Sequence, residues 1–171
     1  MSIIGITGSI ASGKTTVANL LTRKKYPLFS ADKIVSNLYT QKDFLKVIAK
    51  KFKLKHNKKI KEQIKTILKK NKKNIYKLEA VTHPRVRKEM KIFLKKKNKF
   101  LFLEIPLLIE SKLGKYFDTV VFVNTKKKIR LKRYLKRKGN KKTFELLNSR
   151  QLSSVIKKKM CSYTINNNYS L

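Results

Sequence analysis

The first residues of the chain that could do chemistry form a short segment close to the N-terminus. The segment follows the pattern Gly-x-x-x-x-Gly-Lys-Thr. A loop of this composition can turn its backbone N–H groups inward around phosphate oxygens, while the lysine reaches the outer phosphates and the threonine hydroxyl holds Mg²⁺. The pattern therefore predicts a site for ATP or a similar triphosphate. The candidate contacts are Gly8, Ser9, Ile10, Ala11, Ser12, Gly13, Lys14, Thr15 and Thr16.

A strand and a helix must hold this loop in place. Residues 3–7 are a β-branched run that suits a buried strand. Residues 14–21 are predicted to form a helix, whose positive N-terminal end would face the same anion. The alternative interpretation is an ordinary turn between a strand and a helix, because short motifs also occur by chance.

Carboxylates are scarce, which narrows the choice of a general base. The chain has three aspartates, Asp32, Asp43 and Asp118. Only Asp32 follows a strand close to the loop, so it is the best candidate to take a proton from a hydroxyl group. Its position equally allows it to cap the helix predicted at 33–38. Glu104, near the end of the apolar segment 99–108, could hold the water shell of Mg²⁺ or be a partly exposed strand residue beside a lysine.

Histidine and arginine offer further candidate contacts. His83 precedes Pro84, a pair that predicts a helix boundary, and the histidine could touch a substrate or stabilise a turn. Arginines recur at spacings of three and four on one predicted helix. Planar contact with phosphate is a property of arginine, and a solvated helix face is the alternative. These arginines are Arg130, Arg133 and Arg137.

Short apolar strands alternate with helical patterns along the whole chain. Lysine-rich helices are expected over 43–97, and an exposed helix after residue 124 is expected to be capped by Gly139. The alternation predicts an α/β fold with a mostly parallel sheet, and such sheets bind ligands beyond the carboxyl ends of their strands. The strands are expected at 3–7, 28–29, 99–108 and 119–124 and after Cys161.

The net charge is extreme, with 45 Lys and Arg against 9 Asp and Glu. Such a field attracts polyanions, so a basic nucleic-acid-binding protein is one candidate. However, the excess is nearly all lysine and spreads from Lys24 to Lys159, as the codon usage of an AT-rich genome would produce. Zinc-finger and RNA-recognition signatures are missing, and aromatic residues do not alternate with the basic ones. We therefore expect no specific nucleic-acid partner.

The remaining composition bears on the compartment. The single cysteine excludes a disulfide within the chain and suits a reducing environment. The first apolar residues run directly into the loop, unlike a signal peptide, and the longest apolar stretch, 100–109, is too short to span a bilayer. These features predict a cytoplasmic protein without a membrane partner.

Taken in order, several segments resemble the dephospho-coenzyme A kinase family. "GITGSIASGKTT" is similar to the phosphate loop of that family, and "SADKI" to its Asp-Ala-Asp segment, whose second Asp is Asp32. "LEAVTHPRVR", "EIPLLIE" and "RYLKRKG" resemble its His-Pro, Pro-Leu-Leu-x-Glu and lid segments, and "SRQL…YTINNN" its closing segments. The chain departs from the family at Ser30, the first Asp, and at Leu147, where an arginine is usual; the family also usually adds a helix beyond the position of Leu171.

The resemblance implies ATP-dependent phosphorylation of the ribose 3′-hydroxyl of dephospho-coenzyme A, with Mg²⁺. The rival is another small-molecule kinase with the same loop, acting on a nucleoside, a nucleotide or shikimate. The implied fold is a single P-loop kinase domain over 1–171: a P-loop NTPase core (1–32, 98–126 and 160–171), a helical substrate-binding insertion (33–97) and a small lid (127–158).

The resemblance also implies roles for individual residues. Asp32 and Lys14 are catalytic, Asp32 as the base, and Arg137 joins the loop in binding ATP. Thr15 and, through water, Glu104 hold the metal. The substrate contacts that it implies are Asp32, His83, Arg85, Leu107 and Arg133.

Overall fold

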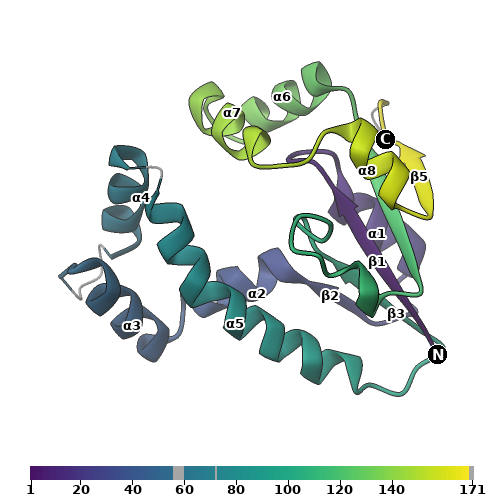
Figure 1. The fold of residues 1–171 in the computed structure, drawn as a ribbon, viewed down its shortest axis with the longest axis horizontal. Coiled ribbons are helices and arrows are strands. Elements are labelled where there is room, and N and C mark those ends of the chain that lie inside the picture. The colour runs from purple at the N-terminus through teal and green to yellow at the C-terminus, as the bar shows by residue number, and fades with distance from the viewer. Residues whose placement is uncertain (56–59, 72, 170–171) are drawn as a thin grey trace. The chain divides into compact units, whose positions relative to one another are not determined.

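The computed structural model describes residues 1–55, 60–71 and 73–169 (Figure 1). The chain divides into two compact units. Met1–Ser30 and Lys97–Leu171 form the first unit, and Ala31–Lys96 form the second.

The first unit contains a five-stranded sheet in the order β2-β3-β1-β4-β5. All of its strand pairs are parallel, which confirms the predicted α/β fold. In the register, Glu104 lies opposite both Ile6 and Ser30, so the carboxyl ends of three strands meet at one edge. The strands are β1 (Ser2–Gly8), β2 (Leu28–Ser30), β3 (Phe100–Glu104), β4 (Thr119–Asn124) and β5 (Tyr163–Asn166).

Helix α1 of the first unit packs directly on this sheet. The apolar face of α1 (Lys14–Thr22) places Val17 and Ala18 against Ile6, Phe102 and Val123. Ile6, Ala18 and Val123 have no exposed surface, so the loop between β1 and α1 is attached at both ends to a packed core. The other helices of this unit are α6 (Lys127–Lys136), α7 (Lys141–Ser149), α8 (Ser154–Met160) and the 3₁₀ turn η1 (Gly114–Tyr116).

Two local expectations in the first unit are wrong. The strand predicted over 99–108 ends at Glu104, because Pro106 has no N–H to donate to a strand ladder. Gly139 does not cap α6: the C-cap is Arg137, and the left-handed residue is Lys138, at φ 59°. Gly139 instead packs so tightly against the ring of Tyr134 that a Cβ would collide with it.

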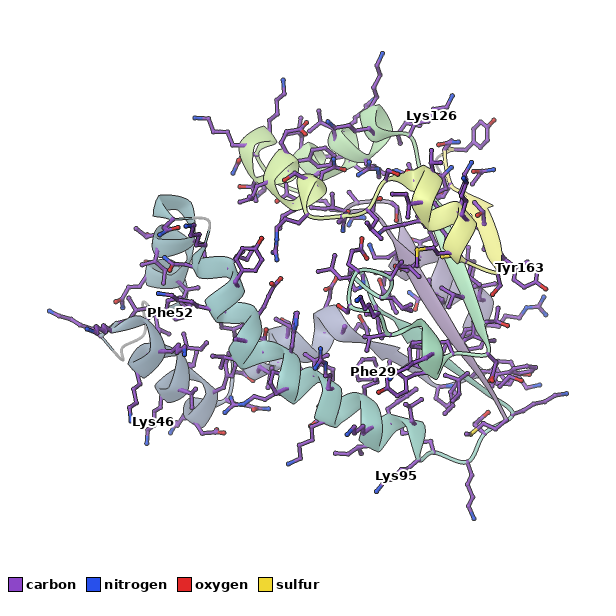
Figure 2. All side chains as sticks on the ribbon, in the orientation of Figure 1. Phe29, Lys46, Phe52, Lys95, Lys126 and Tyr163 are labelled. Atoms are coloured by element: carbon purple, nitrogen blue, oxygen red, sulfur yellow. The ribbon has the colours of Figure 1, made fainter. Side chains whose placement is uncertain are left out.

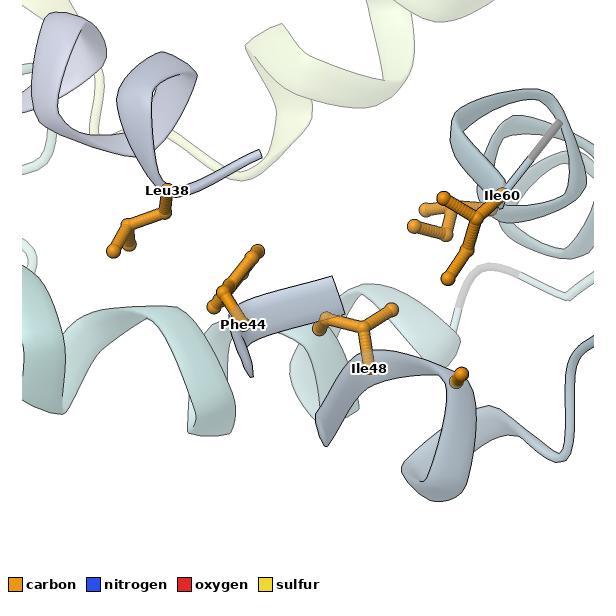
Figure 3. Packing of buried hydrophobic residues seen from close by; sticks show 6 residues of the cluster. Leu38, Phe44, Ile48 and Ile60 are labelled. Carbon is orange, nitrogen blue, oxygen red and sulfur yellow. The ribbon is translucent and has the colours of Figure 1, made fainter. Parts of the chain in front are cut away.

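In its described residues, the second unit contains four helices, α2 (Ala31–Leu38), α3 (Lys42–Phe52), α4 (Ile60–Lys70) and α5 (Asn74–Leu94). The long helix α5 contacts each of the other three. Their apolar faces meet in a core of their own (Figure 3), in which Phe44 and Ile48 have no exposed surface. This core consists of Leu38, Phe44, Ile48, Ala49, Ile60 and Ile64.

The helix boundary expected at His83-Pro84 is absent, because α5 runs through Pro84. Proline removes one helical hydrogen bond and crowds the preceding turn. Packing on both sides of Pro84 outweighs this cost, since Val81 and Val86 lie against the core and Met90 is buried further on.

Lysine side chains extend into solvent from both units, as at Lys46 and Lys126 (Figure 2). Within the described residues, no helix combines the length and the apolar character that a membrane span requires.

Phe44 is the residue on which the second unit's core most depends. Its ring meets that of Tyr39 edge-on at 5.3 Å, and the guanidinium of Arg85 lies 4.9 Å from its centroid. We expect Phe44→Ala to lower the free energy of unfolding by about 3–5 kcal/mol, because it leaves a cavity. Val47→Ala, on the exposed side of α3, is the control, with an expected change below about 1 kcal/mol. Urea denaturation followed by circular dichroism measures both; equal changes would contradict this packing.

Candidate active site

The loop between β1 and α1 has the backbone of an anion cradle. Gly13, the N-cap of α1, has φ +87°, a left-handed backbone conformation that residues other than glycine rarely adopt. The first N–H groups of a helix have no acceptor within it, so the start of α1 presents donors and a positive dipole at this loop. The strand, loop and helix predicted from the sequence are therefore all present.

The loop is also too tight for a larger residue at its first glycine. A Cβ on Gly8 would lie 2.6 Å from Ser12 Oγ and 2.7 Å from the carbonyl oxygen of Val123. Ser12 is completely buried, and its Oγ has no hydrogen-bond partner within the described part of the chain. The interior of the loop thus holds a hydroxyl group that can still donate a hydrogen bond to a ligand.

Lys14 brings a positive charge into the same loop. Its side chain is buried, with 7% of the residue exposed, and its Nζ donates a hydrogen bond to the carbonyl oxygen of Ser9, 3.1 Å away. Burying a charged ammonium is costly in free energy unless an oppositely charged or polar group compensates it. A positive charge at this place would stabilise a bound phosphate.

Thr15 and Glu104 form the acidic side of the site. Thr15 Oγ1 donates a hydrogen bond to Glu104 Oε1 at 2.7 Å. Only 2% of Glu104 is exposed, and its Oε2 lacks a hydrogen-bond partner among the residues described. The alternative interpretation of Glu104 as a partly exposed strand residue is therefore wrong. A hydroxyl and a buried carboxylate, both oxygen donors, fit Mg²⁺, which kinases usually hold through few protein oxygens together with phosphates.

Distant segments hold the cradle through the carbonyl oxygen of Ser12. Thr125 Oγ1 donates to this oxygen at 3.0 Å and Asn167 Nδ2 at 2.8 Å. Arg133 Nη1 lies 3.4 Å from the same oxygen, and its Nη2 donates to the carbonyl of Tyr169 at 2.8 Å. The arginine predicted to contact phosphate thus lies against the loop itself.

Ile10 is held by its N–H and its carbonyl. Its N–H donates to Gln151 Oε1 at 2.9 Å, and its carbonyl accepts from Arg130 Nη1 at 3.5 Å. Arg130 also donates to Thr125 O at 3.1 Å and to Asn148 Oδ1 at 2.8 Å. Only 5% of Arg130 is exposed, so a solvated face does not describe this residue.

Burial has an electrostatic effect on Arg130. Desolvation lowers the pKa of its guanidinium, and the nearby charge of Glu145 acts in the opposite direction. Because an arginine pKa starts far above neutral pH, we treat Arg130 as a permanent positive charge beside the loop.

The other predicted site residues lie on several elements. Leu107 follows β3 and is half-buried, and Arg137 is exposed at the end of α6. Asp32, His83 and Arg85 belong to the second unit. Asp32 lies inside the first turn of α2, which begins at Ala31, so it does not precede the helix as a cap would.

Sequence reasoning assigned no role to several residues that support the loop. For Thr125, the only indication in the sequence is its position directly after a predicted strand. Gln151 and Asn167 occur in the quoted closing segments, but their contacts with the loop span 141 and 155 residues of chain. Local patterns cannot reveal such pairings.

The likeness to known proteins covers the whole chain. Residues 2–171 match the family model described as dephospho-CoA kinase. A dephospho-CoA kinase from Bartonella henselae is 34% identical, over 96% of this chain and 88% of its own length. The solved dephospho-CoA kinase of Campylobacter jejuni is 30% identical with a TM-score of 0.66, over 98% of this chain and 89% of that one.

A more distant structure supports the fold alone. Shikimate kinase from Acinetobacter baumannii, solved with shikimate, has a TM-score of 0.58 at 16% identity, over 99% of this chain and 86% of that one. The fold is thus that of the P-loop kinases, as predicted. Since the family model spans nearly every residue, the chain belongs to the dephospho-CoA kinase family, whose members are transferases that phosphorylate an alcohol group.

Proposed function

We propose that the chain transfers the γ-phosphoryl group of ATP to the ribose 3′-hydroxyl of dephospho-coenzyme A, giving coenzyme A and ADP. The observation that carries this proposal is the buried Lys14 inside a complete phosphate cradle, in a chain that matches the family from end to end. We assign the reaction to the cytoplasm, with a small-molecule acceptor and neither nucleic acid nor membrane as a specific partner.

In this proposal the loop 8–16 binds the phosphates of ATP. The N–H groups around Gly13 and the ammonium of Lys14 offset the negative charge that develops on the transferred group. Mg²⁺, when bound, would neutralise charge on the outer phosphates. Thr15 Oγ1 would ligate the metal, and Glu104 would accept hydrogen bonds from its water shell.

Asp32 is proposed as the general base. The covalent connection to the sheet supports this assignment. Asp32 follows Ser30 by two residues, so their Cα atoms are at most about 7.6 Å apart. Ser30 in turn lies opposite Glu104 in the sheet register. A carboxylate at this place can accept the proton of a hydroxyl that attacks the γ-phosphate.

The remaining contacts divide between the acceptor and the lid. His83, Arg85 and Leu107 are proposed to bind dephospho-coenzyme A. Arg85 is suited to this because the buried Nη1 of its guanidinium has no hydrogen-bond partner in the described chain. Arg133 would contact phosphate of the acceptor, and Arg137 would contact ATP when the lid segment is in place.

The reaction can be tested directly with purified protein, ATP and Mg²⁺. We expect ADP release to depend on dephospho-coenzyme A, and coenzyme A to appear as the product by mass spectrometry. Lys14→Ala serves as the control, with turnover reduced on the order of 10²–10³-fold, as for loss of a positioned donor. Turnover with shikimate or a nucleoside, and none with dephospho-coenzyme A, would contradict the proposal.

Glu104→Gln tests the metal assignment. The substitution keeps the size and the hydrogen bond from Thr15 but removes the charge that faces the metal's water shell. We expect the Mg²⁺ concentration for half-maximal activity to rise about 10–100-fold, as for other outer-shell ligands. ATP binding measured by calorimetry without Mg²⁺ should stay unchanged; an unaltered Mg²⁺ requirement would exclude Glu104 from the metal site.

Asp32→Asn tests the base, and Asp43→Asn is its matched control. Both aspartates lie in the first turn of a helix in the second unit, so each substitution removes a similar small stabilisation of the helix dipole by a negative charge. We expect kcat to fall roughly 10²–10⁴-fold in Asp32→Asn, because an amide cannot take the proton. The control should keep its kcat. A folded Asp32→Asn protein with unchanged kcat would show that the base lies elsewhere.

A further inference from the structure

A buried ion pair lies outside the residues assigned so far. Lys157 on α8 has no exposed surface, and its Nζ is 2.8 Å from Oε1 of Glu110, whose side chain is 14% exposed. Glu110 follows β3, in the segment that also carries Leu107. Lysine is seldom fully buried, and an apolar pair of the same volume is often as stable as a buried ion pair. Stability alone therefore does not explain this pair.

The same carboxylate oxygen makes a second contact. Glu110 Oε1 also accepts the backbone N–H of Leu152 at 2.9 Å. The residue before it, Gln151, accepts the N–H of Ile10 in the phosphate loop at 2.9 Å. Leu152 is thus bound to Glu110 of the ion pair, and the preceding residue, Gln151, is bound to the phosphate loop.

We propose that Glu110 is a positioning residue for ATP binding and that the buried Lys157 balances its charge. The side-chain oxygen of Glu110 fixes the peptide of Leu152, and this sets Gln151 where it accepts the Ile10 N–H. The segment after β3 and the phosphate loop are thereby tied together through residues 151 and 152. This inference rests on the loop binding ATP, as proposed above.

Two double variants separate positioning from stability. In Glu110→Gln/Lys157→Met the charges are gone, but the amide oxygen can still accept the Leu152 N–H. In Glu110→Leu/Lys157→Met both the charges and the acceptor are gone, and the apolar pair should melt at a temperature at least as high. Lys158→Met, on the exposed side of α8, is the control for losing one lysine.

ATP affinity, measured by calorimetry, is the deciding quantity. We expect the control and the glutamine variant to bind ATP within about twofold of the unaltered enzyme. The leucine variant should bind ATP on the order of tenfold more weakly, although it melts no lower. Equal ATP affinity in the two double variants would overturn the proposal. Unaltered enzyme that does not bind ATP would instead refute the proposed function.

Amide hydrogen exchange on the unaltered enzyme gives a second measurement that needs no variant to fold. If the peptide of Leu152 fixes Gln151, the amides of Ile10 and Leu152 must open together. We expect the two to show similar protection, and the Ile10 amide to lose part of its protection in the leucine variant. Exchange at Ile10 that is much faster than at Leu152 would also overturn the proposal.

Discussion

The structure of the first unit depends on keeping one loop in a conformation that it would not hold alone. A cradle for phosphate gathers N–H donors and a buried ammonium around a small volume, and these like partial charges repel one another until an anion arrives. Gly13 permits the backbone conformation, but it does not enforce it. The enforcement comes from donors on distant segments, which hold the carbonyls of Ser12 and Ile10 from outside.

The parallel sheet places the other groups of the site next to this loop. The strands β1, β2 and β3 end at the same edge, and Glu104 lies where their ends meet. A carboxylate at this edge accepts a hydrogen bond from Thr15 in the first turn of α1, so oxygen ligands and backbone donors lie on adjoining sides of one site. In a chain of net charge +36, a buried carboxylate also provides one of the few negative groups near a site for anions and metal.

Local sequence patterns predicted most of the elements around the loop. The strand before the loop, the helix after it and β4 follow from β-branched runs and helical spacing, and Glu104 from its place at a strand end. The helix boundary predicted at His83-Pro84 failed for a physical reason that a single segment does not reveal: Pro84 stays helical because the core packs on both sides of it. The cap predicted at Gly139 was also wrong, because Lys138 takes the left-handed conformation and Gly139 packs against Tyr134. The hydrogen bonds of Gln151 and Asn167 to the loop join residues more than a hundred positions apart, which no local pattern encodes.

The contacts at Ser12 have a consequence for how this chain can vary over evolutionary time. Three donors meet at a backbone oxygen, which every amino acid possesses. These three contacts limit only the bulk of the enclosed side chain at position 12, whereas its buried Oγ, which can donate to a ligand, limits its chemistry. At positions 125 and 167 the donor is the side chain itself, so drift there is limited by chemistry. The loop's geometry is thus inherited largely through residues outside the motif that defines it.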